Sequence, residues 1–80
     1  MIRFYFHIRE GDRLFKDPEG AEFQNVETAR AEAVRSAREL LSQRVLNGEE
    51  IDGQSFELTD DSGAVVDTVK FRDVLRLHQG

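Results

Sequence analysis

The chain has 80 residues, with 11 Lys plus Arg against 16 Asp plus Glu, a formal net charge of -5 and no Cys. This length predicts one domain spanning 1–80, and the lack of Cys excludes disulfides and cysteine metal sites. Apolar residues make up 39% and charged residues 34%, a balance that indicates a folded rather than a disordered chain.

Nothing in the sequence indicates export or membrane insertion. Residues 1–9 alternate charged with apolar side chains, whereas a signal peptide needs an uninterrupted apolar run of about 7 to 15 residues. No segment approaches the roughly 18 apolar residues of a membrane span, and neither end carries a lipidation motif. We therefore expect a cytoplasmic, soluble protein without a membrane partner.

The first 23 residues predict a β-hairpin. Residues 2–9 alternate strictly, with the apolar side chains Ile2, Phe4, Phe6 and Ile8 on one side, which is the period of a half-buried strand. A turn at 10–12 leads into a returning strand over 13–17. The sequence Asp17-Pro18-Glu19-Gly20 is typical of a type I turn, and residues 21–23 extend the strand briefly.

Residues 25–47 predict a helix, because the apolar spacing changes to about 3.6 residues. Asn25 is a good N-cap, and Asn47-Gly48 is a good C-terminal stop. The middle of the inner face is alanine at Ala29, Ala33 and Ala37. Small residues let a helix approach a sheet closely. We therefore expect the first strand to lie under the helix, with its Phe rings filling the remaining space.

A second hairpin is expected over 54–71, with a turn at residues 60–63. The register of its last strand is open, because Val65 and Val66 are adjacent. We expect Val66 to point inward, since the other register would bury the Asp67 carboxylate. In the tail, 72–80, the helical spacing of Phe71, Val74 and Leu75 predicts a short turn that packs over one end.

These elements predict an α+β fold of hairpin-helix-hairpin order (ββαββ). The sheet has four mainly antiparallel strands, and one helix packs on one of its faces. The order of the strands is not determined. A helix on one side leaves the other face of the sheet open, and we expect Tyr5, one of Leu14 and Phe15, and Val65 to lie there.

Several segments resemble one family along nearly the whole chain. They are the opening Arg3-Phe4-Tyr5-Phe6-His7, the Gly11 turn, Asp17-Pro18-Glu19-Gly20, the helix segments 29–33 and 37–41, and Phe71-Arg72-Asp73-Val74-Leu75. The family comprises short alphaproteobacterial proteins, common in rhizobia, and is a domain of unknown function, number 6894. The resemblance implies a hairpin-helix-hairpin domain and supplies no catalytic or binding residues. Lys70 stands where proline is common in the family.

A second likeness is to antitoxins of the HicAB class, which also place a hairpin before a helix rich in glutamate and alanine. This likeness rests on pattern alone. Such antitoxins often carry an added DNA-binding segment, and this chain has none after its fourth expected strand.

The candidate interaction face is the polar side of the first strand, called here the stripe. Its residues are Arg3, Tyr5, His7 and Arg9. Arg13 and Lys16 are considered as neighbours on the adjacent strand. Cations interleaved with aromatic rings on a sheet can bind single-stranded RNA. However, the stripe holds one Tyr and no RNA-recognition signature, and Glu10 and Asp12 lie beside it. We therefore favour a protein partner or a homodimer, and keep a small RNA-binding or antitoxin-like regulator as the alternative.

The charge distribution also weighs against general phosphate binding. The segment 49–69 holds seven acids and no Lys or Arg, and the remainder carries +2. Such an acidic lobe repels nucleic acid at long range, so binding would need another face.

No residue is expected to be catalytic, to bind a cofactor or to bind a metal. His7 has no partner at an identifiable spacing, and His78 lies in the tail. The acids at 49–52 and 60–61 do not follow the alternating ligand pattern of a calcium loop. Phosphate-binding loops, serine elbows and paired zinc histidines are absent from the sequence.

Overall fold

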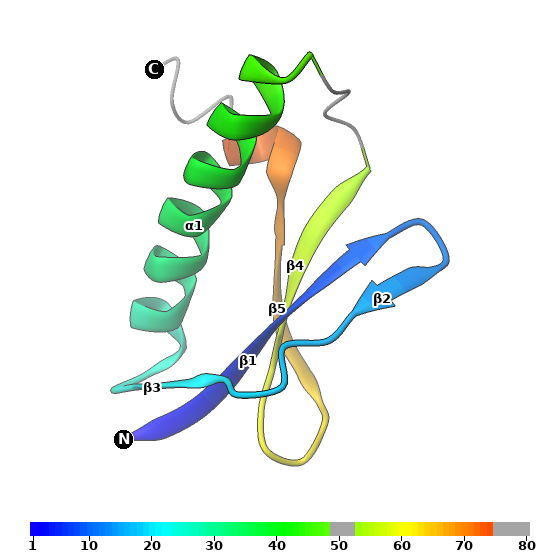
Figure 1. Cartoon of the computed structure of the whole chain (residues 1–80). Coiled ribbons are helices and arrows are strands. Elements are labelled where there is room, and N and C mark those ends of the chain that lie inside the picture. Colours follow the sequence, from blue (N-terminus) through cyan, green and yellow to red (C-terminus); the bar gives the residue numbers. More distant parts are fainter. Residues whose placement is uncertain (49–52, 75–80) are drawn as a thin grey trace.

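The computed structural model describes residues 1–48 and 53–74. Its elements are β1 (Ile2–Glu10), β2 (Arg13–Phe15), β3 (Ala21–Phe23), α1 (Val26–Leu46), β4 (Gln54–Thr59) and β5 (Val65–Lys70). The sheet order is β2-β1-β4-β5, β3 also pairs with β1, and all pairs are antiparallel. Helix α1 crosses one side of the sheet (Figure 1). The α+β class and the antiparallel sheet with one main helix are confirmed.

The predicted count of four strands is wrong, because the returning strand of the first hairpin is broken in two. The β2 strand pairs with residues 8–10 of β1, and β3 pairs with residues 2–4. Between them, residues 16–20 leave the ladder. Pro18 has no N–H to donate, and Gly20 adopts a positive φ of 66°, which a strand does not accommodate. Residues 1–48 and 53–74 therefore form five strands.

Helix α1 begins and ends close to the predicted positions. The Asn25 side-chain oxygen accepts hydrogen bonds from the N–H of Thr28 at 2.8 Å and from its hydroxyl at 2.7 Å, as an N-cap does. After Leu46 the chain reaches Gly48 with φ 75°, the left-handed geometry that ends helices.

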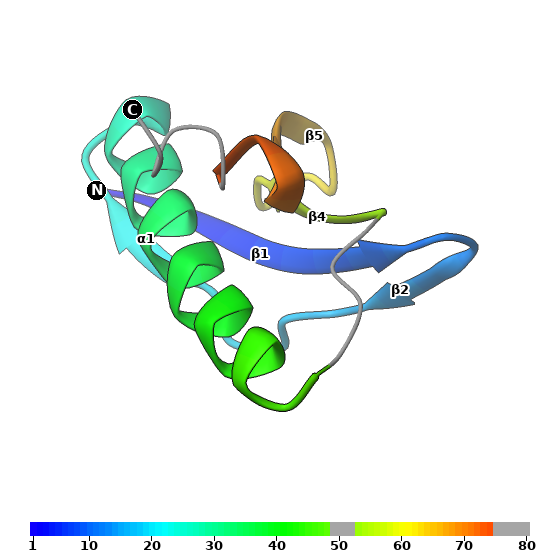
Figure 2. The ribbon, with the colours of Figure 1, turned by 90° about the horizontal axis from the view of Figure 1, so that it is seen from above.

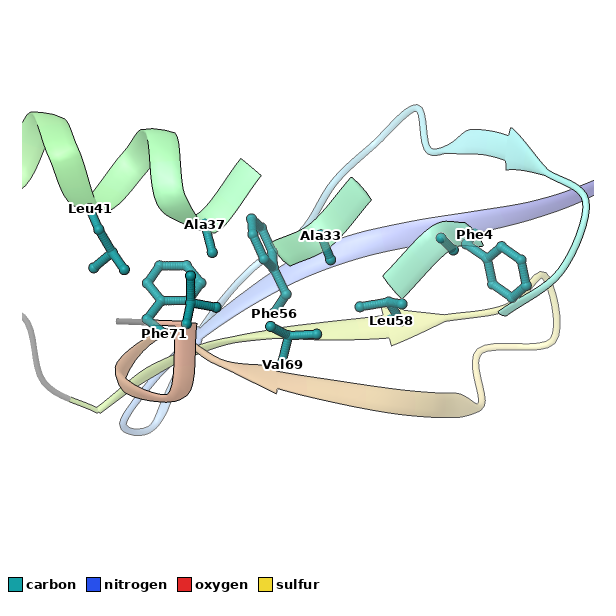
Figure 3. Packing of buried hydrophobic residues seen from close by; sticks show 10 residues of the cluster. Phe4, Ala33, Ala37, Leu41, Phe56, Leu58, Val69 and Phe71 are labelled. Carbon is teal, nitrogen blue, oxygen red and sulfur yellow. The ribbon is translucent and has the colours of Figure 1, made fainter. Parts of the chain in front are cut away.

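The core lies between α1 and the sheet. Ala29, Ala33 and Ala37 are fully buried, which lets the helix approach the sheet closely. Figure 3 shows Ala33 and Ala37 facing the larger side chains below the helix. The other buried apolar residues are Phe4, Leu41, Phe56, Leu58, Val69, Phe71 and Val74. A well-packed core of this kind is sensitive to added volume.

The first strand lies only partly under the helix. Helix α1 approaches β5, β4 and β3 most closely, and Figure 2 shows the β1–β2 hairpin continuing past the helix. Sheet twist turns the end of β1 away from the helix axis. Strand β1 nevertheless contributes to the core. The Phe4 ring near its start is 2% exposed, and Phe6 and Ile8 pack against the core while partly buried.

The predicted inward position of Val66 is also wrong. Thr59 lies opposite Val65 and Leu58 opposite Asp67, with a register shift between Leu58 and Thr59. Val66 is 39% exposed. Asp67 takes the helix side of β5, where the Arg30 guanidinium lies 3.0 Å from its carboxylate. The sequence predicted that the Asp67 carboxylate would avoid the helix side, but its ion pair with Arg30 neutralises the charge there.

A helical turn follows β5 at residues 71–74. Phe71 and Val74 are both 1% exposed, and the Phe71 ring lies edge-on to Phe56 with centroids 5.1 Å apart, which confirms this part of the predicted turn. Leu75, the tail with His78, and the acids Glu49, Glu50 and Asp52 lie outside the described residues. Within 1–48 and 53–74, no helix is both long and apolar enough to cross a membrane.

Candidate functional site

The four residues of the candidate face lie together on the side of the sheet opposite α1. Alternation along β1 places Arg3, Tyr5, His7 and Arg9 on one side, and α1 covers the other side (Figure 2). Opposite residues of an antiparallel pair share a face. Their neighbours on this face are therefore Glu22 of β3 and Ser55, Glu57 and Thr59 of β4.

Both arginines of the stripe are paired with acids. The Arg3 guanidinium donates to the Glu19 carbonyl at 2.6 Å and to the Glu22 carboxylate at 3.3 Å. Arg9 Nε donates to Glu57 Oε2 at 3.0 Å. The positive charge of the stripe is thus largely balanced within the domain.

Tyr5 and His7 form an aromatic pair at the middle of the stripe. Their ring centroids are 6.0 Å apart and their planes lie at 29°. The Tyr5 hydroxyl donates to Asp61 Oδ1 at 3.3 Å, which links β1 to the β4–β5 turn. The Tyr5 ring also packs on Gly20, where a Cβ would lie 3.0 Å from ring carbons.

His7 is anchored by Asp17. The backbone N–H of Asp17 donates to His7 Nδ1 at 3.0 Å. This contact spans ten positions of the chain and ties the His7 ring to the backbone at the break. His7 therefore holds the segment between β2 and β3 against β1, and it has a structural partner that the sequence did not reveal.

The Asp17 carboxylate fills the gap between β2 and β3. It accepts the N–H of Phe6 at 3.2 Å, and also those of Glu19 and Gly20 at 3.2 Å each. The Phe6 N–H would otherwise lack a strand partner at the break. The Asp-Pro-x-Gly sequence identified Asp17 as a turn residue, but it gave no signal for its bonds to β1.

Hydrogen bonds stabilise the ionised form of this carboxylate. Partial burial acts to raise the pKa of Asp17, but the N–H groups of Gly20, Phe6 and Glu19 and the adjacent His7 outweigh it, so the pKa lies below the usual 3.8. The pKa of Asp60 is also lowered, first by the Ser62 hydroxyl and then by the Ala64 N–H. Both acids organise turns through these bonds.

Arg13 and Lys16, which the sequence suggested as neighbours of the stripe, do not both lie beside it. Arg13 lies opposite Glu10, on the other face, with its guanidinium 5.3 Å from the Phe15 ring centroid. Leu14 lies opposite Arg9 and shares its face, while Phe15 lies opposite Ile8 on the helix side. Lys16 is exposed beyond the end of β2. Arg13 therefore does not extend the stripe.

A small cavity of about 150 Å³ opens at the far end of the sheet, lined by Gly53, Gln54, Ser55, Lys70 and Arg72. Its volume is below the roughly 300 Å³ at which small-molecule pockets begin. In the described part of the chain, no group of three or more His, Cys, Asp or Glu side chains is placed to hold a metal ion.

One helix over one face of an antiparallel sheet, with paired polar side chains on the other face, defines a small two-layer α+β domain. The chain belongs to the family described as Domain of unknown function (DUF6894), which matches residues 3–72. Neither a curated protein nor a solved structure matches it.

Proposed function

We propose that this domain is a non-catalytic interaction module of the bacterial cytoplasm, which associates with a second copy of itself or with another protein. The contact surface is the sheet face opposite α1, called here the open face; its residues are Arg3, Tyr5, His7, Arg9, Leu14 and Val65. The observation that carries the proposal is the internal pairing of the polar side chains on this face.

Pairing supports docking because the side chains are already ordered. Association costs free energy for every side chain that it immobilises, and the Arg9–Glu57 and His7–Asp17 contacts fix theirs in advance. Tyr and Arg are also the residues most often enriched at the centres of interfaces. The exposed Val65 adds apolar area beside Thr59.

Sedimentation across the micromolar range tests self-association. The variant Val65→Glu places a charge on the open face at a residue that is 52% exposed, so it should dissociate a homodimer without unfolding the domain. The control is Leu46→Glu, which makes the same charge change on an 85% exposed helix residue. For a heteromeric partner, a protein captured by the wild type and by Leu46→Glu should be lost from Val65→Glu. Monomeric behaviour together with no such partner would remove the proposal.

The alternative function is a small RNA-binding or antitoxin-like regulator, which the stacked Tyr5 and His7 rings favour. It has less support, because phosphates would have to displace Glu22 and Glu57 from the arginines. Binding to a single-stranded oligonucleotide should then weaken steeply with salt and with Arg3→Ala plus Arg9→Ala. Absent or salt-insensitive binding would exclude this function.

A further inference from the structure

Strand β5 is at the end of the sheet order. In the described part of the chain, its outer edge has no strand neighbour. Such an edge can add a strand from another chain through unpaired backbone N–H and C=O groups. The register shift near Leu58 and the helical turn at 71–74 confine this edge to a short stretch centred on Thr68.

The backbone of Thr68 points away from β4. The Phe6 N–H is bound by Asp17 on the β2–β3 side of β1, so the odd residues of β1 direct their backbone groups toward β4. His7 lies opposite Glu57, so Glu57 directs its backbone groups toward β1 and its neighbour Phe56 directs them toward β5. Phe56 and Val69 therefore form a hydrogen-bonded pair, whereas Glu57 and Thr68 do not. Thr68 therefore presents both its N–H and its C=O at the outer edge.

Two charged side chains form hydrogen bonds with the Thr68 backbone N–H and C=O. Asp67 Oδ1 accepts the Thr68 N–H at 2.8 Å, and Arg30 donates to the Thr68 carbonyl at 3.3 Å. The same Arg30 nitrogen lies 3.0 Å from Asp67 Oδ2. The Arg30–Asp67 ion pair thus already binds the backbone N–H and C=O of Thr68, which an incoming strand would need for pairing.

We propose that Arg30 and Asp67 act as an edge guard that prevents β5 from pairing with β5 of a second copy. A charged residue on the inward side of an edge strand is a known means of blocking edge pairing. This role explains why Asp67, rather than a valine, takes the helix side of β5. The edge guard leaves only surfaces other than this edge for association of the folded domain. The proposal does not depend on whether the open face binds a partner.

The test removes the guard without changing net charge. The double variant Arg30→Ala with Asp67→Thr eliminates both guarding side chains and leaves the formal charge at -5. The matched control is Arg35→Ala with Glu32→Ala, which removes an ion pair from α1 that does not involve β5 and also leaves the charge unchanged. Sedimentation equilibrium gives the dimer dissociation constant, and amide hydrogen exchange reports on Thr68 and Lys70.

In the guard variant, we expect a dimer dissociation constant at least tenfold lower than in the control and the wild type, equivalent to about 1.4 kcal/mol. Its Thr68 amide should exchange faster than in the wild type when dilute, and become protected as the dimer forms. The proposal is overturned if the variant folds but associates no more than the control. It is also overturned if a wild-type dimer already protects Thr68 and Lys70.

The result is independent of the open-face proposal. An open-face dimer is lost in Val65→Glu and leaves the exchange of Thr68 unchanged with concentration. If circular dichroism shows that the double variant does not fold, Arg30→Gln with Asp67→Val replaces it. This pair also removes both charges and leaves the formal charge at -5, and the same comparison of dissociation constants then decides.

Discussion

Asp17 makes two hydrogen bonds to β1 at the break in the first hairpin. Its backbone N–H donates to His7 Nδ1, and its carboxylate accepts the N–H of the neighbouring Phe6. The contact joins the centre of the open face to the turn that supports it. A histidine that the sequence marks as an exposed strand residue is therefore part of the hairpin architecture.

Replacing His7 by Phe should destabilise the domain. Phe keeps a ring to stack on Tyr5 but has no acceptor, so the half-buried Asp17 N–H loses its partner at a cost of about 1 kcal/mol. The measurement is the free energy of unfolding in urea. His7→Asn is the control, because its amide oxygen can accept near the position of Nδ1, and it should lose less. Equal stability of His7→Phe and the wild type would show that this hydrogen bond contributes nothing.

Stability should fall in acid partly through Asp17. Its pKa is lower in the folded state than the usual 3.8, so the folded state favours the ionised carboxylate. The contribution is complete above that usual value and disappears as pH falls through the lower folded value. Asp17→Asn should therefore flatten the dependence of unfolding free energy on acid pH relative to the wild type. An unchanged slope in Asp17→Asn would contradict the assignment.

Gly20→Ala should be far more damaging than Gly11→Ala. Both glycines have positive φ, 66° and 60°, so both variants carry the left-handed cost of roughly 1 to 2 kcal/mol. At Gly20 the new Cβ would also lie 2.8 Å from the Phe4 carbonyl oxygen, whereas at Gly11 nothing lies within 4 Å. Thermal unfolding of the two variants compares them directly. Similar losses would mean that the turn moves away from β1 without cost.

Ala33→Leu should overpack the core between α1 and the sheet. Ala33 is fully buried, and added volume in such a position costs about 1 to 3 kcal/mol. Ala31→Leu, on the exposed side of the same helix, should leave the free energy of unfolding nearly unchanged. If both variants unfold at the same denaturant concentration, the core tolerates the extra volume.

Much of the architecture could be predicted because its signals are local. Alternation over residues 2–9 indicated β1, and the Asn25 cap and Gly48 stop bounded the helix within a residue or two. The spacing of Phe71 and Val74 identified the final turn. The break between β2 and β3 was missed, although Pro18 and Gly20 carry its signal, because a turn motif does not say whether the ladder resumes in the same register.

The candidate face was predicted as a set of residues but not as a set of contacts. Alternation alone puts Arg3, Tyr5, His7 and Arg9 on one side of a strand. Their partners Glu22, Asp61 and Glu57 come from other elements. Only the sheet register determines which acids meet these residues, so a stripe that reads as basic in the sequence is balanced in the fold.

The sequence by itself determined a small acidic α+β chain with an alanine-lined helix and an amphipathic first strand, because periodicity and capping depend on neighbouring residues. Tertiary structure alone decided the position of Asp67 on the helix side of β5. A partly buried carboxylate is less favourable without a partner, and the partner of Asp67, Arg30, lies 37 positions earlier in the chain. The cost of a charge depends on what the fold brings beside it, which no local pattern contains.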